Sequence, residues 1–476
     1  MKQYEITKLI MGSFPYDPTA DQNQLIAELS AFMTDNKPNS LFILKGYAGT
    51  GKTTVISSLV RVLPQTGRSS VLLAPTGRAA KVLSSYSDAP AYTIHKKIYR
   101  LQNSKEGNPV LVNQKNKHRD TVFIVDEASM IPLLNSGGSS GLFGEVNLLD
   151  DLISYVYNGN NCRMILLGDT AQLPPVMSPG SPALKRKLIE SRYNLSVREY
   201  ELRDVVRQSR ESGILLNATR LRQMLNMGEC GFPKIQTGGF PDVIRVSGQE
   251  AAEEVDSAYL DQGVEQSLMI CRTNKRATLF NKHIRHRVLF MEGEINAGDL
   301  LMVVKNNYFW INGTEGPEFI ANGDIIELKR IIKTEEQYGF RFADAIFRLT
   351  DYPDAGDLEA KLLLDTLDSD GSSLSSGRLA DLYGSVSADY SDIPNKRERN
   401  KMIRSDKYLN ALQVKFAYAM TCHKAQGGQW QNVFVEMGFI PGKIPDTEYL
   451  RWLYTAVTRA QKKLFLLNFS DDFFPE

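Results

Sequence analysis

The chain has 476 residues, of which 42% are hydrophobic and 23% charged, and its formal net charge is +1. These values are typical of a soluble protein of about three or four globular domains. They neither support nor exclude a nucleic-acid partner, because a channel that holds one strand needs only local positive charge. A membrane-spanning apolar run, a secretory signal and a paired-cysteine pattern are all missing from the sequence. We therefore expect a cytoplasmic protein with no membrane partner, no disulfide framework and no zinc site.

Short apolar segments alternate with helical patterns in the first half of the chain. The segments 41–44, 71–74, 122–125 and 164–167 are bounded by Gly, Asp or Pro, which is typical of buried strands in a parallel sheet. Residues 53–63 follow the first segment and are predicted to form its crossover helix. A second pattern of this kind begins near residue 211, with strands predicted at 268–270, 434–435 and 464–467 and a basic helix at 274–290. The sequence predicts an α/β fold with two such domains.

Three segments interrupt this alternation. Residues 99–120 are polar around Gly107-Asn108-Pro109 and are predicted to form a small hairpin insertion. Residues 135–144 are predicted to form a Gly/Ser-rich loop. The stretch 291–412 is predicted to be a small antiparallel β module that divides the second α/β domain, because Asn322-Gly323-Asp324 precedes an apolar run and an alternating segment. Within it, 365–392 is rich in Ser, Gly and Asp and is predicted to be a mobile loop.

Residues 46–53 read Gly-Tyr-Ala-Gly-Thr-Gly-Lys-Thr and match the phosphate-binding pattern G-x-x-x-x-G-K-[ST] between a predicted strand and a predicted helix. The glycines allow backbone N–H groups to turn towards an anion, Lys52 reaches the β- and γ-phosphates, and the Thr53 hydroxyl ligates Mg²⁺. The alternative is a Gly-rich turn that matches by chance. The expected nucleotide contacts are Gly46, Ala48, Gly49, Thr50, Gly51, Lys52, Thr53 and Thr54.

Polar residues follow two of the predicted strands at the sheet edge where α/β proteins bind ligands. Asp126 is predicted to hold Mg²⁺ and Glu127 to polarise the attacking water. Gln172, in the segment 168–176, is placed to sense the γ-phosphate and the water. The alternatives are a solvated strand end for the carboxylates and an ordinary strand-to-turn junction for Gln172.

The order of these motifs resembles superfamily 1 DNA helicases, most closely the 5′→3′ branch with RecD-like and phage Dda-like helicases. The most specific segments are Thr421-Cys422-His423-Lys424-Ala425-Gln426-Gly427 and Tyr454-Thr455-Ala456-Val457-Thr458-Arg459. The resemblance implies that Gln22 contacts adenine, that Arg207 touches the γ-phosphate, that Arg459 is an arginine finger and that Gly427 also borders the nucleotide.

The resemblance also implies a set of contacts with single-stranded DNA. They are carried by segments similar to the family's DNA-binding motifs, with the alternative of structural histidines for His95 and His423. The expected contacts are Pro75, Thr76, Arg78, Thr93, His95, Thr421, His423 and Lys424. Tyr308, Phe309 and Trp310 either stack on bases or belong to a core, and the basic run 275–287 is either a solvated helix face or a DNA track.

The resemblance implies two RecA-like P-loop NTPase domains with an SH3-like accessory domain. The expected boundaries are 1–210 for the first RecA-like domain, interrupted by the strand-separating hairpin 99–120; 211–290 with 413–476 for the second; and 291–412 for the SH3-like domain. The implied function is an ATP- and Mg²⁺-dependent DNA helicase moving 5′→3′ on single-stranded DNA, with tailed or forked duplexes as substrates. It would act as a monomer alongside proteins of repair, replication or recombination.

Three other functions remain open at this point. One is a P-loop ATPase of another class, which would leave the segments 421–427 and 454–459 unexplained. Another is a DNA-dependent ATPase or translocase subunit of a repair or nuclease complex without free unwinding activity. The third is an RNA helicase, because nothing in these motifs distinguishes RNA from DNA.

Overall fold

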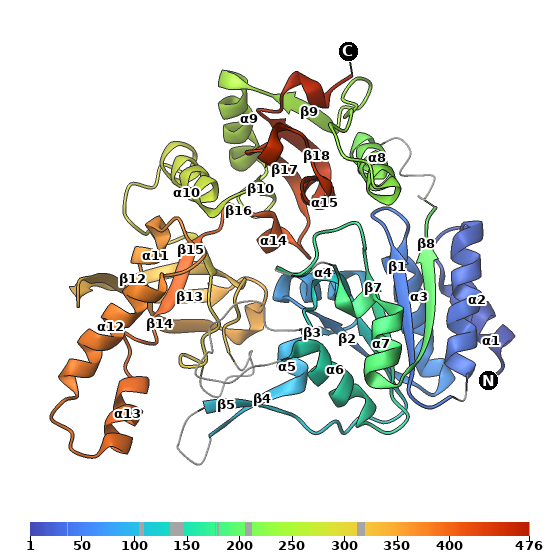
Figure 1. The fold of residues 1–476 in the computed structure, drawn as a ribbon, viewed down its shortest axis with the longest axis horizontal. Coiled ribbons are helices and arrows are strands. Elements are labelled where there is room, and N and C mark those ends of the chain that lie inside the picture. Colours follow the sequence, from blue (N-terminus) through green and yellow to red (C-terminus); the bar gives the residue numbers. More distant parts are fainter. Residues whose placement is uncertain are drawn as a thin grey trace.

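The computed structural model describes residues 1–475 except 36, 104–108, 134–146, 177, 179, 205–211 and 312–318. Figure 1 shows three groups of elements: a sheet with helices at the right, a second sheet at the top and a β-barrel at the left. None of the helices in this described part combines the length and apolar composition needed to cross a bilayer.

The first sheet is parallel and has the strand order β3-β2-β6-β7-β1-β8. Alternate residues of a strand face opposite sides, so Leu41 and Ile43 enter one core while Phe42 and Leu44 enter another. Helices cover both faces, which explains why these strands are apolar along their whole length. The strands are β1 Ser40–Gly46, β2 Ser69–Ala74, β3 Ala91–Thr93, β6 Thr121–Val125, β7 Arg163–Gly168 and β8 Ser196–Leu202.

The helices of this part divide between the two faces of the sheet. Residues of α1, α2 and α3 pack in the core with Phe42, and residues of α5, α6 and α7 in the core with Leu41. The helices are α1 Gln3–Ser13, α2 Ala20–Thr34, α3 Lys52–Val62, α4 Gly77–Ser87, α5 Ile94–Ile98, α6 Leu148–Tyr157 and α7 Arg186–Tyr193. The strands and the crossover helix predicted in this half of the chain are confirmed.

The second sheet is also parallel, in the order β16-β10-β17-β18-β9. Its strands come from two stretches of sequence, one before and one after the stretch that forms the barrel, as the sequence predicts. The strands are β9 Val243–Val246, β10 Ser267–Cys271, β16 Ala419–Thr421, β17 Trp430–Glu436 and β18 Ala460–Leu467. The helices are α8 Gly213–Met227, α9 Gly248–Asp261, α10 Asn274–His283, α14 Cys422–Ala425 and α15 Thr447–Val457.

The inserted β module is a closed barrel of β11 Leu300–Val303, β12 Ile325–Gln337, β13 Phe340–Leu349, β14 Asp357–Leu363 and β15 Leu412–Phe416. Two expectations need correction. The module is not wholly antiparallel, because β14 and β15 pair in parallel. Its last strand also runs past the boundary expected at 412, since Leu301 of β11 pairs with Phe416.

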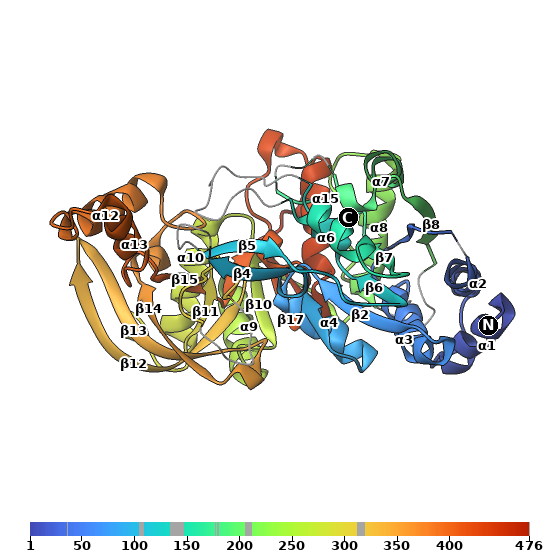
Figure 2. The ribbon, with the colours of Figure 1, turned by 90° about the horizontal axis from the view of Figure 1, so that it is seen from below.

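The prediction of a mobile loop at 365–392 is wrong. This stretch contains α11 Asp365–Asp368 and α12 Ser376–Asp389, and α13 Lys396–Arg404 follows. The Ser375 side chain accepts a hydrogen bond from Arg378 N–H and caps α12, while Leu382 and Val386 pack against Phe342 of the barrel. A polar composition concealed a short amphipathic helix. In both views α12 and α13 stand at the barrel end of the molecule, far from the first sheet (Figures 1 and 2).

The basic run 275–287 is neither a wholly solvated face nor a free cationic track. Arg276 pairs with Glu436, Lys282 lies 2.7 Å from Asp368, and Arg285 Nε lies 2.8 Å from Asp299 Oδ1. Arg285 is 2% exposed and Asp299 is fully buried. These pairs tie α10 and the turn after it to the second sheet and to the barrel, so part of the local positive charge is neutralised by the protein itself.

The insertion 99–120 contains the predicted hairpin, with β4 Tyr99–Asn103 antiparallel to β5 Pro109–Asn113. It extends from α5 towards the barrel (Figures 1 and 2). Its expected tip lies largely outside the described residues, as does the loop expected at 135–144. Trp310 packs against the barrel core and donates its indole N–H to Asn410 O at 2.7 Å, which supports the core alternative for that residue.

Candidate active site

The phosphate-binding loop connects β1 to α3 and has the backbone that an anion site requires. Gly49 and Gly51 have φ values of +76° and +81°, a region that favours glycine. A Cβ at Gly46 would lie 2.9 Å from Lys52 Cγ, so glycine lets the lysine stem lie over the strand end. Lys52 Nζ donates to the carbonyls of Gly46 and Tyr47. The loop therefore presents an ammonium group and a helix N-terminus at one point, beside Thr53 and Thr54 of the first turn.

Gln22 supports this loop from α2. Its Nε2 donates to Thr50 O at 3.0 Å, and its Oε1 accepts from Thr19 N–H in the capping box of α2. The residue is 3% exposed. The side chain thus bonds to the protein on both sides and supports the loop, and the adenine contact that the resemblance implied stays a prediction.

Asp126 and Glu127 follow β6 at the carboxyl edge of the first sheet. Glu127 has φ +51°, an uncommon backbone for a residue with a side chain that costs on the order of 1–3 kcal/mol. Its N–H donates to Asp126 Oδ1 at 2.8 Å. Burial raises the pKa of Asp126, opposed by this hydrogen bond and by Lys52 and Arg459. Burial also raises the pKa of Glu127 to about 7, with Arg459 opposing the shift.

Arg459 reaches the same point from the second sheet. Its Nη1 lies 3.9 Å from Glu127 Oε1, and the side chain is almost completely buried. Three hydrogen bonds within the second α/β unit fix the guanidinium: Nε to Thr455 O, Nη1 to Gly428 O and Nη2 to Thr458 Oγ1. A cation from one α/β unit thus faces a carboxylate of the other.

A hydrogen-bonded network that the sequence did not reveal joins the two α/β units beside this pair. The Tyr454 hydroxyl of α15 donates to Asp169 Oδ2 at 2.6 Å and accepts from Ala48 N–H of the phosphate-binding loop at 3.1 Å. Leu173 N–H donates to Thr455 Oγ1 at 2.9 Å. The sequence does contain a signal for it, because the hydroxyl-bearing residues Tyr454 and Thr455 lie between apolar residues of one helix. Their roles depend on which loop packs against them, which no local pattern specifies.

Gln172 lies in this interface and is 5% exposed. Its backbone carbonyl accepts from Arg451 Nη1 at 3.2 Å, while its Oε1 is buried without a hydrogen-bond partner among the described residues. A buried amide oxygen without a partner is uncommon. It leaves Gln172 able to accept a hydrogen bond from a bound water, as the prediction for this residue requires.

The residues expected to hold Mg²⁺ suit that ion. Thr53 offers a hydroxyl and Asp126 a buried carboxylate, whose charge is balanced in part by Lys52. Mg²⁺ is usually bound by one or two protein oxygens together with phosphates and water. Within its described ranges the structure shows no group of three or more metal-ligating His, Cys, Asp or Glu side chains.

Gly427, another residue expected at the nucleotide, lies against α4 in the structure. Gly427 has φ +76°, and a Cβ there would lie 2.8 Å from Ala79 Cβ and 3.2 Å from Thr76 Oγ1, so this glycine contacts α4. Arg207 lies outside the described residues.

The residues expected to contact DNA lie on α4, α5 and α14 or immediately before these helices. Thr76 and Thr93 cap α4 and α5 through hydrogen bonds from Ala79 and Lys96 N–H, and Pro75 precedes the first cap. Thr421 is the N-cap residue of α14, and His423 on that helix is exposed. Lys424 donates to Asn322 Oδ1 of the barrel, and burial lowers its pKa to about 8.

His95 and Arg78 differ from the other expected DNA contacts. Burial lowers the pKa of His95 to about 4, so the ring is neutral at pH 7, and it packs 5.6 Å from Tyr99 and 6.1 Å from Phe319. These contacts favour the structural alternative for His95. Arg78 places its guanidinium 4.5 Å from the ring centroid of Trp430 at the start of β17.

A pH profile of ATP turnover checks the assignment of Glu127. A general base must be ionised, so a carboxyl with pKa about 7 is active above that pH and protonated below it. We expect kcat/KM for ATP to level off above pH 7 and to fall about tenfold for each unit below it. Steady-state hydrolysis between pH 5.5 and 8.5 measures this. Glu190→Gln, which replaces a half-buried carboxylate of α7 paired with Arg186, should keep the profile, whereas Glu127→Gln should lose most activity. A wild-type profile flat to pH 5.5 contradicts the assignment.

Comparison with protein families gives two matches in chain order. A model described as an AAA domain matches residues 19–225, and one described as a UvrD-like helicase C-terminal domain matches 416–467. The first contains the phosphate-binding loop, Glu127 and Gln172, and the second contains Arg459. The two sides of the site therefore correspond to two recognised domains.

Two of the curated relatives are DNA helicases. The ATP-dependent DNA helicase dda of Enterobacteria phage T4 is 28% identical over 310 residues, covering 61% of this chain and 62% of its own length. The ATP-dependent RecD2 DNA helicase of Deinococcus radiodurans is 23% identical over 465 residues, covering 94% of this chain and 50% of its own. The chain thus spans less than two thirds of each of these relatives.

Among solved structures, the Pif1 helicase from Bacteroides in complex with ADP-AlF3 and ssDNA matches with a TM-score of 0.47 and 13% identity, covering 97% of this chain and 95% of that one. The domain matches and the sequence relatives are the informative comparisons. They show an AAA domain followed by a UvrD-like helicase C-terminal domain, and a sequence similar to the Dda and RecD2 DNA helicases.

Proposed function

We propose that the chain is an ATP-dependent DNA helicase that moves 5′→3′ on single-stranded DNA. One observation carries the proposal: Arg459 of the second α/β unit lies 3.9 Å from Glu127 of the first, beside the phosphate-binding loop. ATP with Mg²⁺ would bind at that loop, and hydrolysis would depend on groups from both units. An arginine contributed across an interface stabilises the charge that develops on the transferred phosphoryl group.

The DNA track would run over the ends of helices in both units. Thr76 and Thr93 would contact phosphates from the first unit, and Thr421, His423 and Lys424 from the second. Such contacts are independent of base sequence, as a translocating motor needs. Hydrolysis would then change the spacing of two DNA-binding surfaces. Because one chain supplies both sides of the ATP site, we propose that the monomer is active, working with repair or replication proteins.

The domain division belongs to this proposal. The first RecA-like domain would comprise 1–210 with the hairpin insertion 99–120, and the second 211–290 with the C-terminal part. The accessory domain would begin near 291 and end with β15 at Phe416. Single-stranded DNA and tailed or forked duplexes would be its substrates. The names of the two helicase relatives support DNA as the nucleic acid.

Unwinding of two tailed duplexes tests the direction of movement. A duplex with a 5′ single-stranded tail should be unwound in the presence of ATP and Mg²⁺, and the same duplex with a 3′ tail should not, because the motor would run off the tail away from the duplex. Strand separation followed by fluorescence measures both. Preference for the 3′ tail would overturn the polarity, and DNA-stimulated hydrolysis without unwinding of either would indicate a translocase subunit. Equal activity on RNA tails would overturn the DNA assignment.

A further inference from the structure

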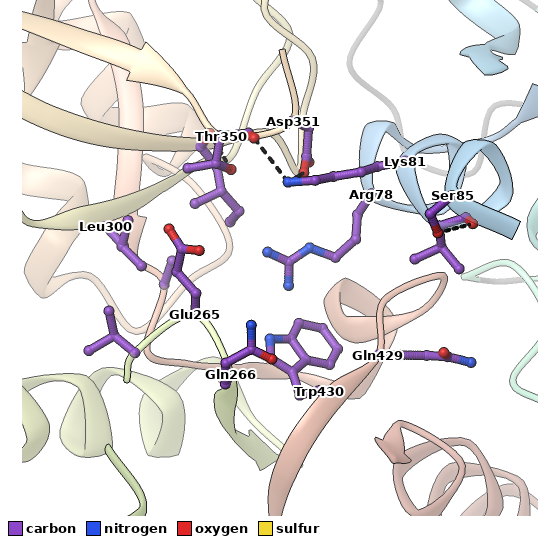
Figure 3. A pocket seen from close by; sticks show the side chains of 14 residues that line it. Arg78, Lys81, Ser85, Glu265, Gln266, Leu300, Thr350, Asp351, Gln429 and Trp430 are labelled. Atoms are coloured by element: carbon purple, nitrogen blue, oxygen red, sulfur yellow. Dashed lines mark hydrogen bonds and ion pairs between the residues drawn. The ribbon is translucent and has the colours of Figure 1, made fainter. Parts of the chain in front are cut away.

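Arg78 lies where three parts of the molecule meet. It extends from α4 into a cavity of about 280 Å³ that is also lined by Lys81, Glu265, Asp351 and Trp430. Figure 3 shows the Arg78 guanidinium in the middle of this cavity, over the indole of Trp430 and facing Glu265. The two carboxylates of the cavity offset the charges of Arg78 and Lys81, and Asp351 lies 3.8 Å from Lys81, so the protein already balances the positive charge that a DNA phosphate would need. The position of Arg78 calls for a role other than a phosphate contact.

The contact between Arg78 and Trp430 joins the first sheet's helix α4 to strand β17 of the second sheet. Trp430 is 3% exposed, so the guanidinium covers a buried ring. Desolvated cation–π contacts of this kind are stronger than exposed ones. Burial lowers the pKa of Arg78, opposed by the charges of Asp351 and Glu265. Arg78 therefore stacks on a ring in a cavity that two carboxylates also line.

The loop beneath Arg78 also holds Arg459. Gly428 O accepts from Arg459 Nη1 at 3.2 Å, and Trp430 N–H donates to Arg459 O at 3.0 Å. The packing leaves no spare room, since a Cβ at Gly428 would lie 2.6 Å from Arg78 Cδ and 2.4 Å from Trp430 Cη2. A displacement of Arg78 would therefore shift the loop that binds both the guanidinium and the backbone carbonyl of Arg459.

We propose that Arg78 is a positioning residue that sets Arg459 against Glu127 through Trp430 and Gly428, and that it is not a DNA contact. This inference rests on the proposed role of Arg459 in ATP hydrolysis. The N-cap of α4 is Thr76, a proposed DNA contact. DNA bound at that helix end would be coupled through Arg78 to the arginine at the ATP site, which gives the structure a direct route for DNA-stimulated hydrolysis.

The test separates catalysis from DNA binding. For Arg78→Ala we expect kcat at saturating single-stranded DNA to fall on the order of 10- to 100-fold, because a small displacement of a catalytic group has effects of that size. The Kd for DNA and its salt dependence should not change. Arg78→Lys keeps the charge and should restore part of kcat. Lys81→Ala, one turn along α4 and lining the same cavity, is the matched control and should retain wild-type turnover.

Two further measurements distinguish positioning from a general loss of structure. Arg459 lowers the pKa of Glu127, so its displacement in Arg78→Ala should move the acidic limb of the kcat/KM profile to higher pH. Trp430→Leu should lower kcat to a similar extent, and the double variant should lose little more than either single one, because the two residues act through one contact.

Defined results would overturn the proposal. If Arg78 contacts a phosphate, Arg78→Ala will weaken DNA binding, reduce the slope of log K against log salt by about 0.7, and leave kcat at saturating DNA unchanged. Multiplicative losses in the double variant, or a lower kcat with an unshifted pH limb, also contradict it. A wild-type protein without ATP turnover would refute the proposed function itself, whereas an active wild type with active Arg78 variants refutes only the role of Arg78.

Discussion

Replacement of Lys52 by alanine is expected to abolish ATP turnover while the protein stays folded. Lys52 is the first residue of α3, and its ammonium donates hydrogen bonds to the loop carbonyls of Gly46 and Tyr47. Bound phosphates would replace these carbonyls as acceptors of the ammonium. Without it, the charge that develops on the phosphoryl oxygens loses its nearest fixed cation on the loop. Loss of one such group typically lowers kcat by on the order of 10²–10³-fold.

Steady-state hydrolysis with and without single-stranded DNA measures this effect, and circular dichroism with thermal unfolding checks the fold. Lys45→Ala is a matched control, because Lys45 lies on β1, the strand that leads into the loop, and its ammonium pairs with Glu199 at 2.7 Å, whereas the Lys52 ammonium lies over the loop. The control should hydrolyse ATP at the wild-type rate. A folded Lys52→Ala variant with normal turnover would remove the assignment of the ATP site.

Replacement of Arg459 should separate ATP binding from hydrolysis. An arginine finger acts on the charge of the transition state, and its loss lowers kcat by about 10³–10⁵-fold. Binding of ATP should change little, because the phosphate-binding loop belongs to the other α/β unit. Since Arg459 opposes the burial that raises the pKa of Glu127, its removal should also move the acidic limb of the pH profile upwards.

Arg459→Ala leaves a cavity in a buried position, so Arg459→Gln, which keeps most of the volume, should be measured beside it. ATP affinity by calorimetry and kcat by a phosphate-release assay give the two quantities separately. Lys462→Ala, on the exposed part of β18, is the control and should behave as the wild type. An unchanged kcat in both Arg459 variants would show that the finger is another residue.

The parts of the fold that were predicted correctly depend on short-range patterns. Segments such as 122–125 are apolar on both faces because helices cover both sides of the sheet, and this leaves a visible run in the sequence. The glycines at 49 and 51 are visible for a similar reason, since the loop needs backbone angles that other residues disfavour. Where composition conflicts with a local pattern, as at 376–389, the serines concealed a capped helix with Leu382 and Val386 on its buried side.

The directions in which side chains point could be predicted from the sequence much less well. The segment around Arg78 resembles a DNA-binding motif, yet the arginine lies on Trp430, a residue far away in the chain. Gln22 turns to Thr50, and His95 packs between Tyr99 and Phe319. Each of these positions is decided by contacts with residues distant in the sequence or in another domain, such as Thr50, Phe319 and Trp430.

The sequence by itself therefore determined the α/β architecture, the phosphate-binding loop and the carboxylates after β6, because periodicity and backbone requirements act between neighbouring residues. Only the tertiary structure decided that Tyr454 reaches Ala48, that Arg459 faces Glu127 and that Arg78 stacks on Trp430. These contacts join residues of different sheets. Their formation depends on how the sheets pack against each other, which is a property of the whole folded chain and leaves no local pattern in the sequence.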